Sequence, residues 1–264
     1  MLSKQSVLIH GVSDKTFGNM VDRPRAPVSL EGRRLLAESL HFSWENAWTP
    51  KIVHGSDIGS ISRKPNGELR CTVHANARPR ILPKDFGNGF DGLITKEKVV
   101  LCVFAADCAP IMFFDYCNRV IGVAHAGLSG AILGIAGHTV RLMAEVYGSK
   151  PANVLAVIGP RLCANCFNIS KSNIWNTKLK HLQPEQVIPN DAFRQAKDGI
   201  MFDLSSCIAT DLVNNGLPRC NVEVSHLCTR CNYENFFSNC VAGMKSRDDQ
   251  EREGRFATIL CGTQ

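Results

Sequence analysis

The sequence predicts an α/β (α+β) fold with mixed sheets, arranged as a single domain over residues 1–264. Near-continuous apolar runs at 99–105, 111–114 and 120–124 suit strands that are buried on both faces. Helices or a second sheet must then cover each side of those strands. Between residues 130 and 147 the apolar side chains recur at helical spacing instead. Buried strands with helices between some of them are typical of this fold class.

The first third of the chain contains fewer clear elements. An apolar run at 7–9 predicts a short strand, and leucines at 30, 35, 36 and 40 predict a helix with Ser29 as its N-cap. Ile52 and Val53 predict a strand that ends in a turn at His54 and Gly55. The stretch 63–89 is rich in Arg, Lys, Pro, Gly and Asn, which predicts a loop with one short strand at 71–73.

The second half of the chain continues the alternation of helices and strands. The helical pattern at 130–147 is followed by an apolar run at 154–158, which predicts a strand that stops at Gly159-Pro160. A further helix is predicted at 202–215, and further strands at 222–224 and 256–260.

Composition limits the classes of function. No apolar stretch approaches the roughly 18 residues of a membrane helix, and the first thirty residues lack the pattern of a secretory signal. We therefore expect a cytoplasmic protein with no membrane association, whose twelve cysteines are reduced thiols. The net charge of +6 is mild, and the basic loop at 63–80 lacks interleaved aromatic residues, so we expect no nucleic-acid partner.

Strong metal ligands follow two of the predicted buried strands. Asp107-Cys108 follows the run at 99–106, and His125 follows the run at 120–124. If these two strands are neighbours, the Cys108 thiol and the His125 imidazole converge, and His54 can supply a third ligand. One thiolate and two imidazoles suit zinc, and three protein ligands leave a fourth position open, as in catalytic zinc sites. The trio therefore predicts one bound zinc ion, against the simpler interpretation of a core cysteine and two hydrogen-bonded histidines.

Six motifs appear in order along the chain. They are DGLIT (91–95), ADCAPIMFFD (106–115), IGVAHAGLSG (121–130), VIGPRLCANCF (157–167), CTRCNYENFFS (228–238) and GRFA (254–257), and HGSDI (54–58) precedes them. With these motifs the chain resembles the laccase-domain (YfiH-like) family of purine nucleoside phosphorylases, first described as polyphenol oxidases. Within that family it resembles the C-terminal domain of the animal laccase domain-containing protein.

The resemblance implies a layered α/β/β/α fold and a zinc site at His54, Cys108 and His125. It implies phosphorolysis of adenosine, inosine, guanosine and methylthioadenosine to the free base and ribose 1-phosphate, together with adenosine deamination. The substrates are then purine nucleosides and phosphate, while protein partners remain unknown.

The resemblance also suggests roles for particular side chains. Cys108, His125 and Asp107 are the candidate catalytic residues. Lys15, Ser129 and Arg161 are the candidate substrate-binding residues. Two motifs depart from the family pattern: HAGLSG has Leu128 and Ser129 where an aromatic residue and a cation are usual, and GVSDKTFGN has Lys15 at the usual Arg position. These departures concern the substrate pocket more than the metal.

Other interpretations remain open at this point. Cys108 as nucleophile and His125 as base would make a metal-free hydrolase or deamidase. A non-catalytic nucleoside-binding or scaffold protein would also keep the fold. Copper is excluded as the expected metal because multicopper oxidases need about ten His, largely in His-X-His pairs, whereas the chain has eight His and no such pair.

Two CxxC pairs, at 163–166 and 228–231, match the ligand spacing of a structural zinc site. The interval between the pairs is longer than zinc ribbons use. The sequence therefore favours structural thiols near the pocket over a second metal site.

Overall fold

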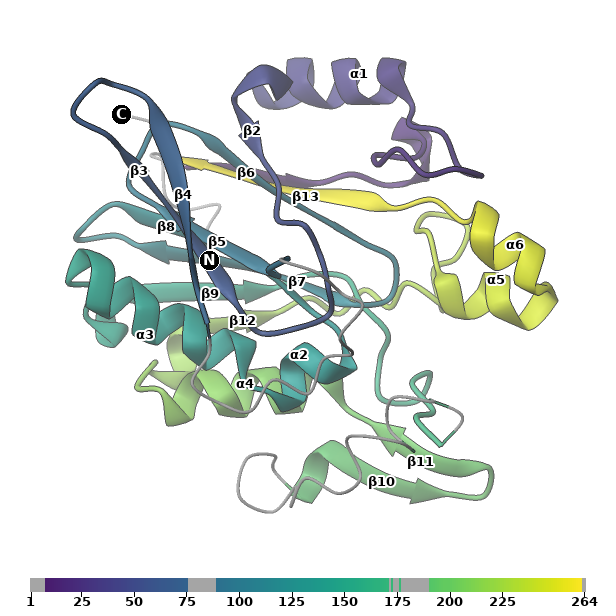
Figure 1. The fold of residues 1–264 in the computed structure, drawn as a ribbon. Helices are drawn as coiled ribbons and strands as arrows, with labels where there is room; N and C mark the ends of the chain where they lie inside the picture. Colours follow the sequence, from purple (N-terminus) through teal and green to yellow (C-terminus); the bar gives the residue numbers. More distant parts are fainter. Residues whose placement is uncertain (1–7, 76–88, 171, 173–175, 177–189, 263–264) are drawn as a thin grey trace.

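Two β-sheets lie face to face between layers of helix in the computed structural model (Figure 1), which describes residues 8–75, 89–170, 172, 176 and 190–262. The smaller sheet has the strand order β1-β13-β6-β2. Its strands are β1 (Leu8–Val12), β13 (Phe256–Gly262), β6 (Val100–Ala105) and β2 (Ala47–Trp48). Because β2 runs parallel to β6 while the other pairs are antiparallel, the sheet is mixed, as predicted.

The larger sheet has seven strands in the order β12-β9-β7-β8-β5-β3-β4. They are β12 (Val222–Val224), β9 (Val154–Ile158), β7 (Ala109–Asp115), β8 (Val120–Ala126), β5 (Gly92–Thr95), β3 (Ile58–Arg63) and β4 (Leu69–His74). A separate hairpin is formed by β10 (Phe193–Ala196) and β11 (Gly199–Phe202).

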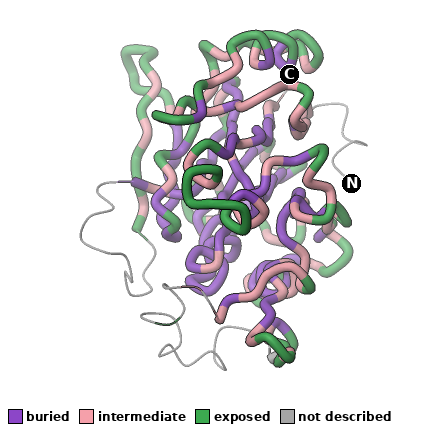
Figure 2. The backbone as a smooth tube through the Cα atoms, turned by 90° about the vertical axis from the view of Figure 1, so that its right-hand side faces the viewer, coloured by how far each residue is buried: buried purple, intermediate pink, exposed green. Residues whose placement is uncertain are grey.

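Helices cover the outer face of each sheet. The helix α1 (Leu30–Leu40) packs on the smaller sheet, and α3 (Ile135–Tyr147) and α4 (Leu204–Asn214) pack on the larger one (Figure 1). Alternate residues of β6 explain the two-sided burial: Val100 and Cys102 face α1, while Leu101 and Val103 face the larger sheet. The expected α/β/β/α layering is confirmed, and buried segments run together through the middle of the molecule (Figure 2).

Most predicted elements are confirmed, and two are wrong. The Ser29 hydroxyl caps α1 by accepting a hydrogen bond from the Gly32 N–H at 2.9 Å. The predicted helix over 130–147 is divided into α2 (Leu128–Ile132) and α3 because Gly134 lies between them in the left-handed conformation, at φ 73°. No strand forms at Ile52 and Val53, since the Val53 N–H donates to a carboxylate rather than to a neighbouring strand.

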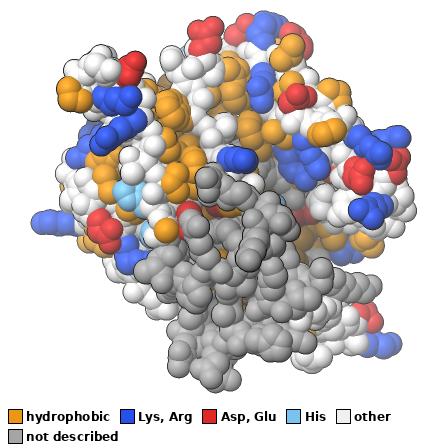
Figure 3. Space-filling view, in the orientation of Figure 1, with side chains coloured by type: hydrophobic (Ala, Val, Ile, Leu, Met, Phe, Trp, Pro, Cys, Tyr) orange, Lys and Arg blue, Asp and Glu red, His pale blue; other side chains and the backbone are white. Residues whose placement is uncertain are grey.

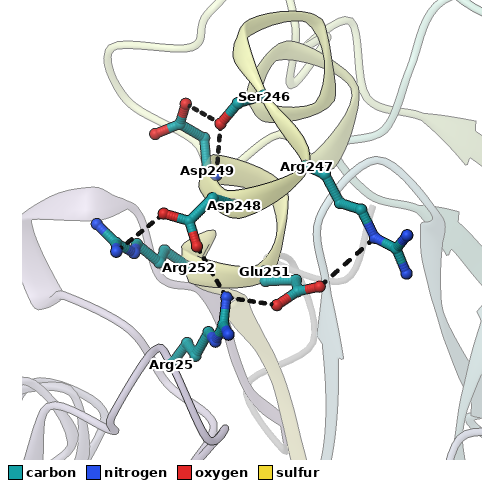
Figure 4. A network of polar contacts seen from close by, with 7 residues as sticks. All are labelled: Arg25, Ser246, Arg247, Asp248, Asp249, Glu251 and Arg252. Atoms are coloured by element: carbon teal, nitrogen blue, oxygen red, sulfur yellow. Dashed lines mark hydrogen bonds and ion pairs between the residues drawn. The ribbon is translucent and has the colours of Figure 1, made fainter.

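A helical insertion precedes the last strand. It comprises α5 (Asn239–Lys245) and α6 (Arg247–Arg252), and Ser246 caps α6 through the Asp249 N–H at 2.9 Å. Arg25 forms ion pairs of 2.8 Å with both Asp248 and Glu251 (Figure 4). These exposed contacts attach α6 to the segment that follows β1, although each is worth only about 0–1 kcal/mol.

Surface features agree with the composition. Among the described residues, no helix is long and apolar enough to cross a membrane. On the face shown in Figure 3, Lys and Arg side chains lie interspersed with acidic and apolar ones. Part of the basic loop at 63–80 lies outside the described residues.

Replacement of Phe113 by alanine tests the two-sided burial of β7. The Phe113 side chain is fully buried against the helical layer of the larger sheet. We expect Phe113→Ala to lower the free energy of unfolding by about 3–5 kcal/mol, measured by urea denaturation. Tyr116→Ala, at an exposed position just beyond the same strand, should change it by less than about 1 kcal/mol. Equal losses for the two variants would contradict this packing.

Candidate active site

The predicted ligand trio comes together in the structure. The ligand atoms of His54, Cys108 and His125 all lie within 4.8 Å of one another. The route differs from the one predicted, because β6 and β8 lie in different sheets and are not paired. Cys108 instead directly precedes β7, which pairs antiparallel with β8 so that Pro110 lies opposite His125. The start of β7 and the end of β8 therefore place the thiol beside the imidazole.

His54 lies in a tight turn before β3. Its backbone has a φ of 58°, which is uncommon for a residue other than glycine. The turn is held by the Asp91 carboxylate, which accepts hydrogen bonds from the backbone N–H groups of Val53 (3.2 Å), His54 (2.9 Å) and Gly55 (2.8 Å). These contacts offset the cost of the left-handed conformation and direct the His54 side chain toward the trio.

The same carboxylate orients His125. Asp91 is fully buried, and its Oδ1 lies 3.1 Å from Nδ1 of His125. Because a carboxylate accepts hydrogen bonds, Asp91 favours the form of His125 that carries a proton on Nδ1. Nε2 of His125 is then the nitrogen available to a metal. Sequence reasoning missed Asp91, although it is the first residue of the DGLIT motif.

Charge is concentrated at the trio. Burial raises the pKa of the Cys108 thiol, but His125 and His54 outweigh it and lower that pKa to about 6. Burial lowers the pKa of His125, but the Cys108 thiolate and Asp91 raise it to about 10. Between these two values Cys108 and His125 form a thiolate–imidazolium pair. A cation held by Cys108 and His125 would take the place of the imidazolium proton between them.

The trio fits a metal ion by its chemistry and its spacing. Thiolate and imidazole together suit borderline-soft divalent ions. Gly127 allows the close approach, because a Cβ at this position would lie 3.0 Å from the Cys108 sulfur and 3.4 Å from the His54 ring. The residues present are therefore compatible with one bound metal ion.

The Asp107 carboxylate is directed to the 229–240 segment, although Asp107 also lines the cavity beside the trio. Its carboxylate accepts hydrogen bonds from the hydroxyls of Thr229 and Ser238, both at 2.7 Å, and from the Cys240 N–H at 2.6 Å. These three donors satisfy a buried carboxylate and tie the 229–240 segment to the residue before Cys108. The contacts favour a positioning role, and the predicted catalytic role of Asp107 stays a prediction.

The three predicted substrate-binding residues lie apart from the cavity beside the trio. Lys15 donates to the Tyr233 carbonyl at 2.5 Å and lies over the Tyr233 ring. Ser129 is buried in α2. Arg161 is buried and donates to Ser205 and to the Ser225 carbonyl, beside a second cavity. None of the three lines the cavity beside the trio, so their contact with substrate stays a prediction.

A cavity of about 1140 Å³ opens beside the trio. His54, Cys108 and His125 form part of its wall. Its lining also includes three arginines that sequence reasoning did not select, namely Arg23, Arg230 and Arg255. Arg230 and Arg255 lie within the CTRC and GRFA motifs, two of the motifs that carry the family resemblance.

The fold is one that known structures share. The structure superposes on the crystal structure of YlmD from Geobacillus stearothermophilus with a TM-score of 0.73 and 25% sequence identity, over 98% of this chain and 93% of the other. The family model described as multi-copper polyphenol oxidoreductase laccase matches residues 11–262. The chain belongs to this laccase-like family.

Relatives in the family carry names of enzymes that act on purine nucleosides. The chain is 32% identical over 233 residues to purine nucleoside phosphorylase YlmD of Geobacillus stearothermophilus, covering 88% of this chain and 77% of that protein. It is 31% identical over 219 residues to adenosine deaminase RL5 of an unknown prokaryotic organism, covering 82% and 78% respectively. This kinship supports an enzyme resembling purine nucleoside phosphorylases.

Asp91→Asn tests the positioning of the trio. The Asn amide keeps one acceptor oxygen. Its N–H₂ group, however, faces donors that share a carboxylate in the wild-type protein. We expect metal affinity, measured by competition with a chromogenic chelator, to fall by about 10- to 100-fold. Asp115→Asn, at the far end of β7 and equally buried, is the matched control and should leave the affinity unchanged. Equal affinities in both variants would show that Asp91 does not orient the ligands.

The thiolate at Cys108 is testable by its reactivity. In chelator-treated protein, we expect alkylation of Cys108 by iodoacetamide to rise with pH through a midpoint near 6, because its pKa is lowered to about 6. Below that pH the thiol is protonated and unreactive. Cys261, whose pKa is raised by burial, serves as the internal control and should react only at alkaline pH. Peptide mass spectrometry separates the two sites, and a Cys108 midpoint at about 8.5, the value of a free cysteine, would contradict the ion pair.

Proposed function

We propose that the protein is a zinc-dependent purine nucleoside phosphorylase with adenosine deaminase activity. Its substrates would be adenosine, inosine, guanosine and methylthioadenosine, together with phosphate. The observation that carries the proposal is a single cavity whose lining contains both the metal-ligand trio and three arginines. The names of the relatives support the same chemistry.

The arginines supply a site for phosphate. Burial and then the neighbouring charge of Arg23 lower the pKa of the Arg255 guanidinium to about 10, against the opposing charges of Cys108, Asp107 and Glu253. Two guanidinium groups that repel each other in a partly buried site favour an anion between them. Phosphate has the negative charge and the pairs of oxygen atoms that a guanidinium group can bind through two parallel hydrogen bonds.

The remainder of the cavity suits a nucleoside. Phe104, Phe167 and Ile52 contribute apolar surface to its lining. Aromatic side chains can stack on a purine, whatever its exocyclic substituents. The volume of about 1140 Å³ exceeds that of many small-ligand pockets, so a nucleoside and phosphate can bind together.

Phosphorolysis requires little covalent chemistry from the protein. A phosphate oxygen attacks C1′ of the ribose while the bond from C1′ to the purine nitrogen breaks, and the purine leaves with the bonding electrons. Arg23, Arg230 and Arg255 would orient the phosphate for this in-line attack and offset its charge. A zinc ion held by His54, Cys108 and His125 would supply a fixed positive charge and Lewis acidity in the same cavity.

Deamination would use the same purine subsite. The C6–N bond of adenine breaks, water supplies the oxygen of inosine, and ammonia leaves. A purine bound against the apolar lining would displace water, which would strengthen the electrostatic effect of the charged groups on the reacting ring.

The fold bears on two further proposals. We infer that residues 1–264 act as a single domain, because β1 and β13, from the two ends of the described chain, pair with each other. We also infer a cytoplasmic location, where reduced thiols such as Cys108 persist.

A metal-free Cys–His hydrolase is the second candidate function. The thiolate–imidazolium pair of Cys108 and His125 favours it, since such a pair is an activated nucleophile. It predicts activity that survives chelation, whereas the phosphorylase should lose activity on chelation and regain it with zinc. A nucleoside-binding or scaffold protein, the third interpretation, predicts binding without turnover in either state.

Arg255→Gln tests the phosphate site in the purified, zinc-loaded protein. Incubation with adenosine and phosphate should release adenine and ribose 1-phosphate, with inosine as the deamination product. Loss of a charge-assisted contact to phosphate should lower kcat/KM for phosphate by roughly 10- to 100-fold. Deamination, which uses no phosphate, should change much less in this variant.

Arg25→Gln is the matched control, since Arg25 lies on the surface in the α6 contacts and should keep full activity. His125→Ala should lose both reactions. Turnover of wild type that persists after metal removal, or the absence of any product with zinc bound, would overturn the proposal.

A further inference from the structure

The two CxxC pairs meet in the structure. Cys163, Cys166, Cys228 and Cys231 are free thiols, and their sulfur atoms all lie within 4.8 Å of one another. Sequence reasoning set this site aside because of the long interval between the pairs. The fold nevertheless brings the two pairs together across that interval, and none of the four residues belongs to the trio at His54, Cys108 and His125.

Backbone pairing explains how the pairs converge. The parallel pairing of β12 with β9 continues beyond both strands into a bridge between Arg161 and Cys228. The Arg161 N–H donates to the Leu227 carbonyl at 3.3 Å, and the Thr229 N–H donates to the Arg161 carbonyl at 3.0 Å. The described part of the intervening chain forms the hairpin, α4 and β12, and the length of this segment does not separate the two ends.

The sulfur geometry fits a single tetrahedral ion. The sulfur atoms of Cys166 and Cys231 are 3.5 Å apart. Four thiolates at the usual Zn–S distance of about 2.3 Å have sulfur atoms about 3.8 Å apart. An iron–sulfur cluster places several atoms between its thiolates and would separate them further. A closed set of four cysteines, with no position left for water, is typical of structural zinc.

Backbone donors around the sulfurs resemble the surroundings of bound thiolates. The Cys163 N–H donates to the Cys228 sulfur at 3.3 Å. Each pair closes into a turn, through the Cys166 N–H to the Cys163 carbonyl at 2.9 Å and the Asn232 N–H to the Cys228 carbonyl at 2.9 Å. These turns direct both sulfurs of a pair to one side, as two ligands of the same ion require.

We propose that Cys163, Cys166, Cys228 and Cys231 bind a second, structural zinc ion. On binding, the four thiol protons pass to the buffer and four zinc–sulfur bonds form. The site would fix the wall of the active cavity, because Cys166 and Arg230 line that cavity and Thr229 donates to Asp107, the neighbour of Cys108. This inference does not rest on the proposed function.

Metal content of the full chain tests the proposal. Protein purified under reducing conditions without chelator should contain two zinc ions per chain by mass spectrometry of the metal. His125→Ala should keep one of them, held by the four cysteines. Cobalt added to the metal-free His125→Ala protein should give the intense absorption of tetrahedral cobalt with four thiolate ligands.

Cys231→Ser replaces an exposed member of the set and should lower the zinc content by one ion, with a lower melting temperature. Cys220→Ser, at an exposed cysteine outside the set, should keep both ions. If Cys231→Ser does not fold, the wild-type content and the zinc kept by His125→Ala still decide the question. No zinc in His125→Ala, iron in place of zinc, or disulfides among these cysteines would overturn the proposal, whereas one zinc in wild type that His125→Ala keeps would locate that ion at the four cysteines.

Discussion

Four donors converge on the buried carboxylate of Asp91: three consecutive backbone N–H groups, from Val53 to Gly55, and Nδ1 of His125. This one side chain therefore fixes the turn that carries one imidazole and the ring orientation of the other. The antiparallel pairing of β7 with β8 supplies the third ligand by placing Cys108 beside His125. The site depends on a rigid sheet and a single buried charge, so little conformational freedom remains to be lost when a metal binds.

Charges of both signs gather at the cavity. The Cys108 thiolate and the buried Asp91 carboxylate attract a cation. Arg23 and Arg255, which also line the cavity, repel each other and attract an anion, while the charge of Cys108 acts on Arg255 in the opposite sense. A cation at the trio and an anion at the arginines would each be bound by groups of opposite charge.

Sequence patterns predicted the strands that are buried on both faces and missed the features that depend on tertiary contacts. The continuous apolar runs predicted β6 to β9, because a strand covered on both faces needs no polar side. The break at Gly134 and the absence of a strand at Val53 arise from backbone conformation and a distant carboxylate, which periodicity does not report. The trio was predicted because its ligand types stand at the ends of apolar runs in the sequence. Asp91 and the convergence of the CxxC pairs were missed because they depend on contacts between distant segments.

Anomalous diffraction at the zinc absorption edge would test the central claim most directly, on crystals of the protein purified without chelator. The account predicts a zinc ion about 2.3 Å from the Cys108 sulfur and about 2.0–2.1 Å from one ring nitrogen each of His54 and His125, with Nδ1 of His125 still on Asp91. Protein that binds zinc elsewhere and leaves no anomalous density among these three side chains would contradict it.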